Sequence, residues 1–388
     1  MREHARKTQS LSPWWAAYDP GLMACVALLL GLGLVMVASA SITVADRDFQ
    51  EPLHYFWRQL VAAGIGISLA VIVMKSPLHY WLRAAPLLLI AAILLLLLVL
   101  LPGLGREVNG SIRWLRLGPL SLQASEPVKL CLVIYLASYL VRYREQVRLT
   151  VMGLVKPVGV LTLIVGLLLL EPDYGVTVVL FATTLGMLFM GGVPMGRFIR
   201  WGGGAIVVLG GIGLLAPYRL ARLTTFINPW ADPYHTGFQL TQALIAFGRG
   251  EWFGVGLGGS VQKLFYLPEA HTDFILAVLA EELGLIGTLV VIASFSFLVW
   301  RAFSIGSQAE RAGRLFAAYL AFGIGLLIGL QAFINIGVNM GVLPTKGLTL
   351  PFISYGSNSL IVACLSLGLL LRIEYEMRFD PEGKGYVT

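Results

Sequence analysis

Charged residues are scarce in this sequence. Asp, Glu, Lys and Arg together make up 13% of its 388 residues, whereas a soluble globular domain carries about 25%. Hydrophobic residues make up 57%, and the mean hydropathy is +0.80. This composition excludes an ordinary soluble enzyme, a disordered protein and a nucleic-acid-binding protein. The net charge of +7 fits a membrane protein whose Lys and Arg residues collect in its cytoplasmic loops.

The sequence also lacks the motifs of several familiar chemistries. Its three cysteines, Cys25, Cys131 and Cys364, each lie inside an apolar run and form no CxxC pair, which predicts buried, unreactive thiols. No HExxH, Walker loop, GxSxG or Cys/His zinc spacing is present. A polar stretch of roughly twenty residues precedes the first apolar run, and no cleavage-like site follows, so no cleavable signal peptide is predicted.

Ten apolar runs approach or reach the length of a membrane-spanning helix, which is about 20 residues. They predict an all-α polytopic membrane protein with a single integral membrane domain over residues 1–388. The predicted spans are Pro20–Ala45, Gln59–Met74, Ala84–Leu101, Ser125–Val141, Lys156–Leu170, Tyr174–Gly196, Trp201–Tyr218, Asp273–Trp300, Leu315–Met340 and Gly356–Leu371.

Lys and Arg are much denser in the loops on the side of the predicted N-terminus, and the positive-inside rule then places both termini in the cytoplasm. The predicted cytoplasmic tails are residues 1–19 and 373–388. The outer side carries a loop at about 102–124 and a large extracytoplasmic loop, 219–272, between the seventh and eighth helices. Within the large loop, Phe238–Gly250 is expected to form a short amphipathic helix at the membrane surface.

Polar side chains at membrane depth are costly and tend to be functional. Glu126 and Lys129 are three residues apart and share one face of the fourth helix. They form either a mutual ion pair or a pair that also binds a charged substrate headgroup. The segment Glu171–Tyr174 is predicted to be the outer turn between helices five and six, either a solvated turn or one that binds a cation.

Two further polar segments face the outer side. Thr272 or Asp273 is expected to cap the eighth helix, and Glu281 and Glu282 follow about 12 Å deeper at 1.5 Å per residue, which predicts a polar cavity. The segment Leu343–Gly356 contains two prolines and two glycines in an apolar stretch. Such a composition predicts re-entrant backbone beside protein or a water-filled cavity, with Lys346 as a cation at that cavity.

Together, these motifs resemble the SEDS family (shape, elongation, division and sporulation). The segments that carry the resemblance are Val108–Leu130, Glu171–Gly175, Tyr218–Gly287 and Leu343–Gly356. The resemblance covers nearly the whole chain, with the ten-helix layout, and it favours the cell-division member over the elongation member. One departure is Ser357-Asn358-Ser359, where the family usually has Gly-Ser-Ser.

The resemblance implies a peptidoglycan glycosyltransferase that polymerises lipid II into glycan strands during septal cell-wall synthesis. It implies a class B penicillin-binding protein, an FtsI-type transpeptidase, as the crosslinking partner, with contacts to membrane lipids and to divisome membrane proteins such as FtsQ, FtsL and FtsB. The expected location is the bacterial cytoplasmic (inner) membrane at the division septum, and no nucleic-acid partner is expected.

The family's essential aspartate falls on Asp273, and we assign this residue as the general base for the attacking sugar hydroxyl. The leaving group is a lipid diphosphate, which favours nearby cations. The substrate-binding candidates are Lys346, Arg113, Lys129, Glu126, His271 and Ser354. A divalent cation, Mg²⁺ or Mn²⁺, is a further expectation, held partly by outer carboxylates and partly by the substrate.

Two other functions are compatible with the composition. A lipid II flippase would use the same cavity, with Glu126, Lys129, Glu281 and Glu282 as relay residues, and its charged groups would continue to the inner side. A division scaffold without catalysis would use only the long outer loop. The main charged candidates cluster on the outer side, which favours the polymerase.

Overall fold

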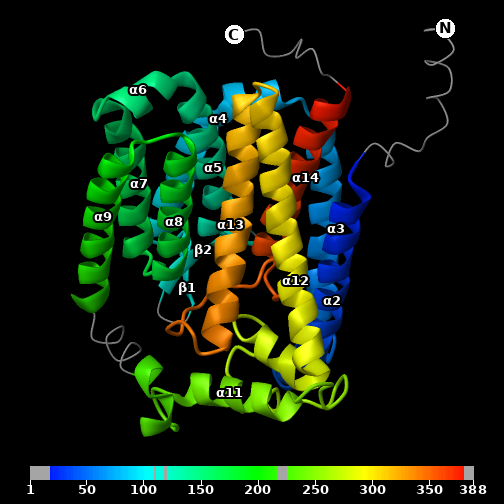
Figure 1. Cartoon of the computed structure of the whole chain (residues 1–388). Coiled ribbons are helices and arrows are strands. Elements are labelled where there is room, and N and C mark those ends of the chain that lie inside the picture. The colour runs from blue at the N-terminus through cyan, green and yellow to red at the C-terminus, as the bar shows by residue number, and fades with distance from the viewer. Residues whose placement is uncertain (1–17, 109–110, 118–119, 216–224, 380–388) are drawn as a thin grey trace, which may run out of the picture.

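The computed structural model describes residues 18–108, 111–117, 120–215 and 225–379. Within these ranges, ten long helices run side by side between the two ends of the molecule (Figure 1). They are α2 (Pro20–Phe49), α3 (His54–Lys75), α4 (Leu78–Leu100), α5 (Ser125–Arg142), α7 (Met152–Leu170), α8 (Tyr174–Met190), α9 (Met195–Leu215), α12 (Ile275–Arg311), α13 (Leu315–Asn339) and α14 (Ser357–Phe379).

These helices confirm the predicted all-α membrane architecture. By length and composition alone, six of the described helices can cross a membrane: α2, α3, α4, α7, α12 and α13. Several helix ends differ from prediction. Helix α8 ends at Met190, before Gly191-Gly192-Val193-Pro194, rather than at Gly196, and other helices continue into polar residues. For example, α14 continues to Phe379, beyond the start of the predicted tail at 373, because Arg372 and Glu376 pair across one turn.

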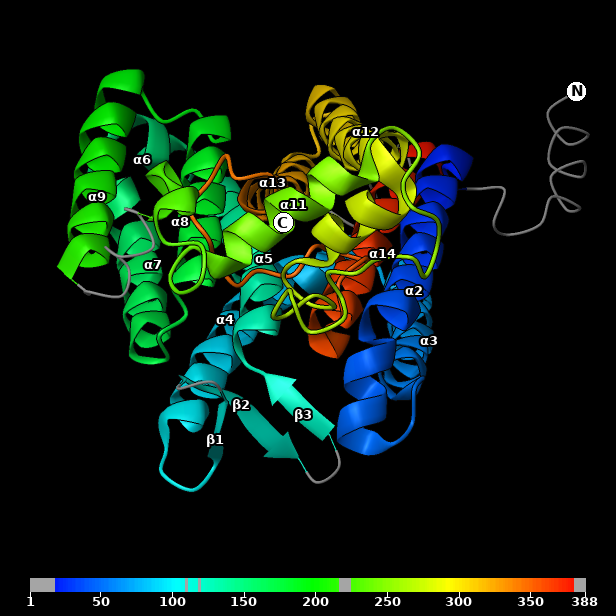
Figure 2. The same cartoon turned by 90° about the horizontal axis from the view of Figure 1, so that it is seen from below.

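The segments predicted to lie outside gather at one end of the bundle, which we call the α11 end after helix α11 (Phe238–Gly250) (Figure 1). The bounds of α11 match the predicted amphipathic helix. It follows a short 3₁₀ turn, η3 (Pro229–Ala231). Figure 2 looks onto this end and shows α11 crossing the bundle close to α12 and α13. Residues 219–224 of the large outer loop and most of both predicted tails lie outside the described residues.

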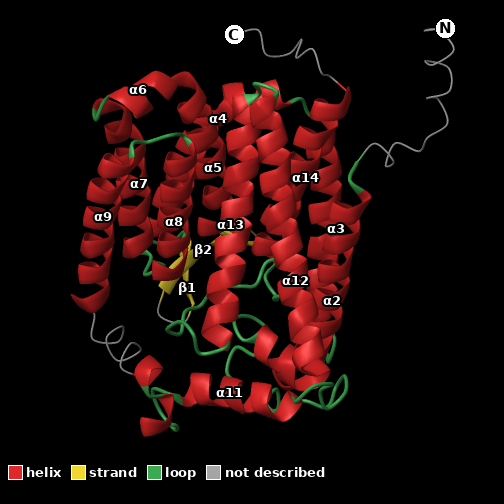
Figure 3. Ribbon diagram, viewed as in Figure 1, coloured by secondary structure: helices red, strands yellow, loops and turns green. Residues whose placement is uncertain are grey.

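A small antiparallel sheet, not predicted from the sequence, occupies the 102–124 loop. Its strands are β1 (Gly105–Val108), β2 (Ser111–Leu117) and β3 (Leu120–Gln123), in the order β1-β2-β3. Figure 3 shows it as the only sheet in the described part of the chain. Asn358 donates a hydrogen bond to the Ser121 carbonyl at 2.9 Å. The residue that departs from the family pattern therefore joins the sheet to the start of α14.

Helix α13 forms the centre of the bundle. It packs against α5, α8, α12 and α14. In its most apolar 18 residues, 72% are buried inside the protein, whereas the corresponding share for α4 is 28%. Close packing explains this burial, since a side chain added at Gly323 would meet Val133 and Met187. The polar face of α13 therefore points at protein rather than lipid. A short helix, α6 (Arg144–Leu149), joins α5 to α7 at the end opposite α11.

Candidate functional site

The loop between α13 and α14 (residues 340–356) is the centre of the candidate site. It has no helix or strand, and its residues 350–354 are buried. A Cβ at Gly33, near the middle of α2, would collide with the Phe352 carbonyl and lie 2.8 Å from the Ile353 Cα. The loop therefore enters the bundle from the α11 end, as the re-entrant prediction requires.

Polar side chains satisfy the backbone of this loop, as buried backbone requires. Gln59 of α3 donates to the Ser354 carbonyl at 3.0 Å and accepts from the Gly356 N–H at 3.2 Å. The Ser354 hydroxyl donates to the Thr272 carbonyl at 2.6 Å and accepts from the Leu350 N–H at 2.8 Å. Ser354, a predicted substrate-binding residue, is thus buried and engaged with two backbone groups.

Asp273 lies two residues before the start of α12 and is half-buried. The expected cap is wrong: the N-cap residue of α12 is Phe274, with no side-chain capping bond. Instead, the Asp273 carboxylate faces the loop, because a Cβ at Gly347 would lie 3.0 Å from its Oδ2. The Asp273 carbonyl accepts hydrogen bonds from Asn335 and Asn339 of α13, each at 2.9 Å. Sequence reasoning missed both asparagines.

Lys346 and Arg113 lie against the turn that joins α7 to α8. The Lys346 Nζ is 3.9 Å from the centre of the Tyr174 ring. Arg113 of β2 donates to the carbonyls of Glu171 at 3.1 Å and Pro172 at 2.7 Å. The sheet, the α7–α8 turn and the re-entrant loop therefore meet at these two cations.

The same turn holds two buried acids. Among the described residues, neither carboxylate oxygen of Glu171 has a hydrogen-bond partner, and Asp173 Oδ2 also has none. Burial and the nearby Asp173 charge raise the pKa of Glu171 to about 8, with Arg113 opposing the shift. The protonated form of Glu171 is therefore favoured at neutral pH, and the turn is a buried acid pair rather than the solvated turn considered from the sequence.

Glu126 and Lys129 form the predicted ion pair at the start of α5. Their charged atoms are 2.9 Å apart, and both side chains are almost fully buried. Lys129 also donates to Gln331 Oε1 at 2.7 Å, and Gln331 Nε2 donates to the Thr349 carbonyl at 2.9 Å. The pair is thereby connected to the re-entrant loop and lines a small cavity of about 20 Å³ with Gln331 and Ser359.

His271 adjoins the loop through its backbone and its ring. Its carbonyl accepts from the Tyr355 N–H at 2.9 Å, and its ring lies 4.8 Å from the Tyr55 ring and 5.6 Å from the Tyr355 ring. Burial lowers the pKa of His271, although Glu269 and Asp48 act in the opposite direction. The neutral imidazole is favoured, so His271 adds an aromatic wall rather than a positive charge.

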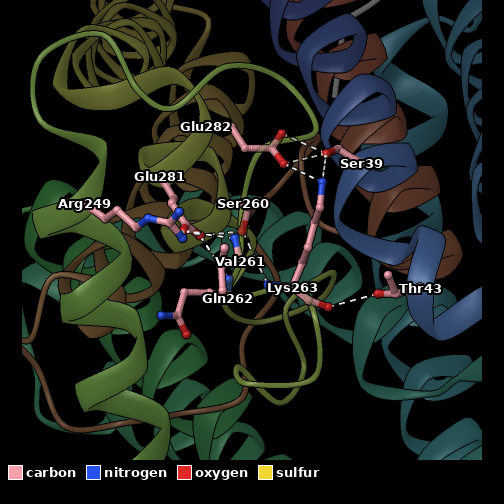
Figure 4. A network of polar contacts seen from close by, with 9 residues as sticks. All are labelled: Ser39, Thr43, Arg249, Ser260, Val261, Gln262, Lys263, Glu281 and Glu282. Carbon is pink, nitrogen blue, oxygen red and sulfur yellow. Dashed lines mark hydrogen bonds and ion pairs between the residues drawn. The ribbon is translucent and has the colours of Figure 1, made fainter.

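Glu281 and Glu282 do not face an open cavity, which corrects the prediction from the sequence. Figure 4 shows that the outer loop covers them. Glu281 accepts from Arg249 at 2.9 Å, from the Ser260 hydroxyl and from the Val261 N–H at 3.1 Å. Glu282 pairs with Lys263 at 2.8 Å, and Ser39 of α2 donates to Glu282 at 2.7 Å. Their burial is balanced by these partners.

The two acids precede a break in α12 at Gly284, whose φ is 68°. In an unbroken helix, the N–H groups of residues 285 and 286 would donate to the carbonyls of residues 281 and 282. Here those carbonyls accept from Val255 and Gly256, and the two N–H groups donate to the carbonyls of Glu251 and Trp252, at 2.9 to 3.2 Å. We call this pairing of residues 250–256 with residues 281–286 the clasp.

Four of the seven predicted site residues, Asp273, His271, Lys346 and Ser354, lie in the re-entrant loop or directly against it. Arg113 contacts the neighbouring α7–α8 turn, and the Glu126–Lys129 pair reaches the loop through Gln331. The carboxylate of Asp273 adjoins Gly347, the residue after Lys346, and the Lys346 ammonium group lies over the Tyr174 ring. A base on one segment and a cation on the adjoining segment suit a displacement in which a proton leaves one substrate and negative charge develops on the other. The re-entrant loop enters the bundle from the α11 end, which is the predicted outer side.

The profile of a family described as "Cell cycle protein" (FtsW, RodA and SpoVE) matches residues 20–379. This chain belongs to that family. The match includes every residue of the candidate site, and it confirms the resemblance predicted from the motifs.

Individual relatives agree with the family assignment. A probable peptidoglycan glycosyltransferase FtsW from Nitrosococcus halophilus is 56% identical over 366 residues, which cover 93% of each chain. A protein of the same name from Coxiella burnetii is 52% identical over 363 residues, which cover 93% of this chain and 97% of that protein.

Solved structures of the family share the fold. One, described as "Structural coordination of polymerization and crosslinking by a peptidoglycan synthase complex", has a TM-score of 0.76 at 33% identity and covers 94% of this chain and 100% of that one. The rod shape determining protein RodA from Thermus thermophilus has a TM-score of 0.70 at 30% identity, and covers 94% of this chain and 99% of that one.

Proposed function

We propose that this chain is a peptidoglycan glycosyltransferase that polymerises lipid II into glycan strands during septal cell-wall synthesis. The observation that carries the proposal is the meeting of the Asp273 carboxylate with the Lys346–Gly347 segment of the re-entrant loop, in a chain 56% identical to a probable FtsW glycosyltransferase. Both groups lie at the α11 end, where an extracytoplasmic substrate with a lipid tail would enter.

Asp273 acts as the general base. The acceptor hydroxyl oxygen forms a bond to the anomeric carbon of the donor sugar while the bond from that carbon to the diphosphate oxygen breaks. The leaving diphosphate takes the bonding electron pair, and the hydroxyl proton passes to the Asp273 carboxylate. A diphosphate needs little acid assistance to leave, so a single base on the attack side suffices for this displacement.

Lys346 stabilises the negative charge that develops on the diphosphate. The Lys346 ammonium group lies over the Tyr174 ring, and the attraction between a cation and an aromatic face keeps this long flexible side chain near the loop. Arg113 contributes positive charge from β2 and also fixes the α7–α8 turn through two carbonyls. Lys129 is buried behind the loop and acts on it through Gln331.

A divalent cation remains part of the proposal in a restricted form. Among the described residues, no three His, Cys, Asp or Glu side chains gather to hold a metal. An Mg²⁺ or Mn²⁺ ion would therefore take most of its ligands from the substrate diphosphate, as Mg²⁺ commonly does. Exhaustive chelation during lipid II polymerisation tests this. We expect a reduced rate that added Mg²⁺ restores, and an unchanged rate would show that no divalent cation takes part in the reaction.

The flippase alternative is not favoured by the contacts of its proposed relay residues. Glu281 and Glu282 are covered by loop cations, and Glu126 is paired with Lys129. At the end opposite α11, Arg301 bridges Asp19 and Glu374 in a further closed set of ion pairs. Among the described residues, the named relay acids are thus all engaged.

The partner we propose is a class B penicillin-binding protein that crosslinks the new strands. The large outer loop offers the contact surface, because its aromatic residues Trp230, Tyr234 and Trp252 are exposed. One of the similar solved structures is described as a complex for polymerization and crosslinking. The proposed location is the cytoplasmic membrane at the division septum, with FtsQ, FtsL and FtsB nearby.

The decisive experiment is polymerisation of purified lipid II by the detergent-solubilised chain, with and without the crosslinking partner. We expect glycan strands from the wild-type chain and a higher rate with the partner. Vesicles that contain the chain and fluorescent lipid II form the companion assay. If lipid II crosses the vesicle membrane and no polymer forms even with the partner present, the flippase function would replace the polymerase function.

A further inference from the structure

Three amide side chains on α13 point at the candidate site. Gln331, Asn335 and Asn339 are four residues apart, so they lie along one face of the helix. All three are buried, with exposed fractions of 4%, 1% and 0%. We call them the amide ladder. Buried amides on a helix need partners, and these find them on the two backbone segments that carry Asp273 and Lys346.

Asn335 occupies the middle position and joins the two segments directly. Its Nδ2 donates to the Asp273 carbonyl at 2.9 Å and to the Leu348 carbonyl at 2.5 Å. Leu348 is two residues from Lys346. A single amide group therefore holds the backbone on both sides of the contact between the Asp273 carboxylate and Gly347.

Each of the neighbouring amides holds one of the two segments close to the Asn335 contact. Asn339 donates to the Asp273 carbonyl at 2.9 Å and accepts from the Ala277 N–H at 3.2 Å, which fixes the first turn of α12. Gln331 donates to the Thr349 carbonyl at 2.9 Å. Asn335 alone of the three contacts both the Asp273 segment and the re-entrant loop.

We propose that Asn335 is a positioning residue that sets the Asp273 carboxylate in register with the Lys346 segment for glycosyl transfer. The proposal rests on the proposed function. Asn335 lies behind the backbone of both segments and acts through them. Positioning errors of about 1 Å can cost about 10²-fold in rate, and loss of this amide frees both segments to separate.

The test is a double-mutant cycle on the purified full-length chain, with lipid II polymerisation measured over a range of lipid II concentrations. Asn335→Ala should lower kcat about 10 to 10²-fold and change KM less than about threefold. In the Asp273→Asn background, adding Asn335→Ala should lower kcat by less than about twofold. The base is already absent there, so its displacement has no further effect.

Two further variants keep the test interpretable. Thr184→Val removes a buried hydroxyl of α8 that bonds only within its own helix, to the Leu180 carbonyl at 2.8 Å, and should retain wild-type activity. Asn339→Ala removes a bond to the Asn335 Oδ1 at 3.3 Å but leaves the two bonds that the Asn335 Nδ2 donates to the two segments, and it should lower kcat less than Asn335→Ala. If Asn335→Ala unfolds early in a thermal scan, Asn335→Leu, which has a similar volume and no amide, replaces it in the cycle with Asp273→Asn.

The possible outcomes separate the two proposals. Losses that multiply in the double variant, or a loss confined to KM, would overturn the positioning role and leave Asp273 as the base. Near-normal activity of Asp273→Asn alone would overturn the base assignment and the positioning role with it. A loss in kcat that vanishes in the Asp273→Asn background supports both.

Discussion

Replacement of Asp273 by Asn should abolish transfer and leave the fold intact. The structure explains why stability survives: the Asp273 carbonyl, not its carboxylate, accepts the bonds from Asn335 and Asn339, and α12 takes no side-chain cap from this residue. An Asn side chain has the same size and keeps these backbone bonds. It cannot accept the hydroxyl proton.

The expected loss follows from the role of a general base. Such a base contributes about 10² to 10⁴-fold in rate, which corresponds to about 2.7 to 5.4 kcal/mol at 1.36 kcal/mol per tenfold. Asp273→Glu should also be slow, because the added methylene moves the carboxylate by about 1 Å.

The assay is lipid II polymerisation by the purified variants, resolved by polymer length, with a thermal unfolding scan and a partner pull-down as folding controls. Wild-type thermal stability with almost no polymer is the expected result for Asp273→Asn. Polymer close to the wild-type amount from that variant would refute the general-base role. A variant that unfolds early would instead show that the carboxylate has a structural role.

Three more predictions concern other parts of the molecule. The pKa of Glu171 is raised to about 8 in the folded state, against a usual 4.5, so the folded state holds this proton more tightly and its stability should fall as pH rises from about 5 to 8. Glu171→Gln should flatten this dependence of the unfolding temperature on pH. If the variant and the wild type show the same pH dependence, the raised pKa of Glu171 is contradicted. Lys263→Met leaves the buried Glu282 carboxylate without its ion-pair partner and should lower the free energy of unfolding by about 3–5 kcal/mol. Adding Glu282→Gln should recover most of the lost shift in the denaturation midpoint, and no recovery would mean that the two residues are not coupled. Tyr234→Ala, at a side chain that is 83% exposed, should reduce stimulation by the transpeptidase without changing the basal rate, and unchanged stimulation would exclude this residue from the contact.

The hydrophobic pattern predicted the bundle well, because each span is a long apolar run whose backbone bonds are local. It also predicted α11, whose apolar residues repeat at helical spacing, and the ion pair of Glu126 with Lys129. The three-stranded sheet was not predicted. Its strands are short, and their pairing across the 102–124 loop depends on contacts with α4 and Asn358.

The site was predicted as a set of residues but not as a geometry. The motifs placed Asp273 and Lys346 on the outer side, 73 positions apart in the sequence, and only tertiary structure brings their segments together. Asn335 and Asn339 were missed because an amide in an apolar helix has no distinctive motif. The available signal was that Gln331, Asn335 and Asn339 recur every four residues, which places them on one face of α13. The partners of Glu281 and Glu282 come from a loop whose path the sequence does not specify.

The clasp has a consequence for how this protein can be rebuilt. Residues 250–256 complete the backbone hydrogen bonding of residues 281–286, and a side chain at Gly254 would collide with the Glu282 carbonyl. The outer loop thus supplies backbone hydrogen-bond partners that α12 would otherwise provide for itself. A chimera that imports this loop from a relative should take residues 250–286 as one cassette, since an exchange that stops at Thr272 would separate two halves shaped for each other.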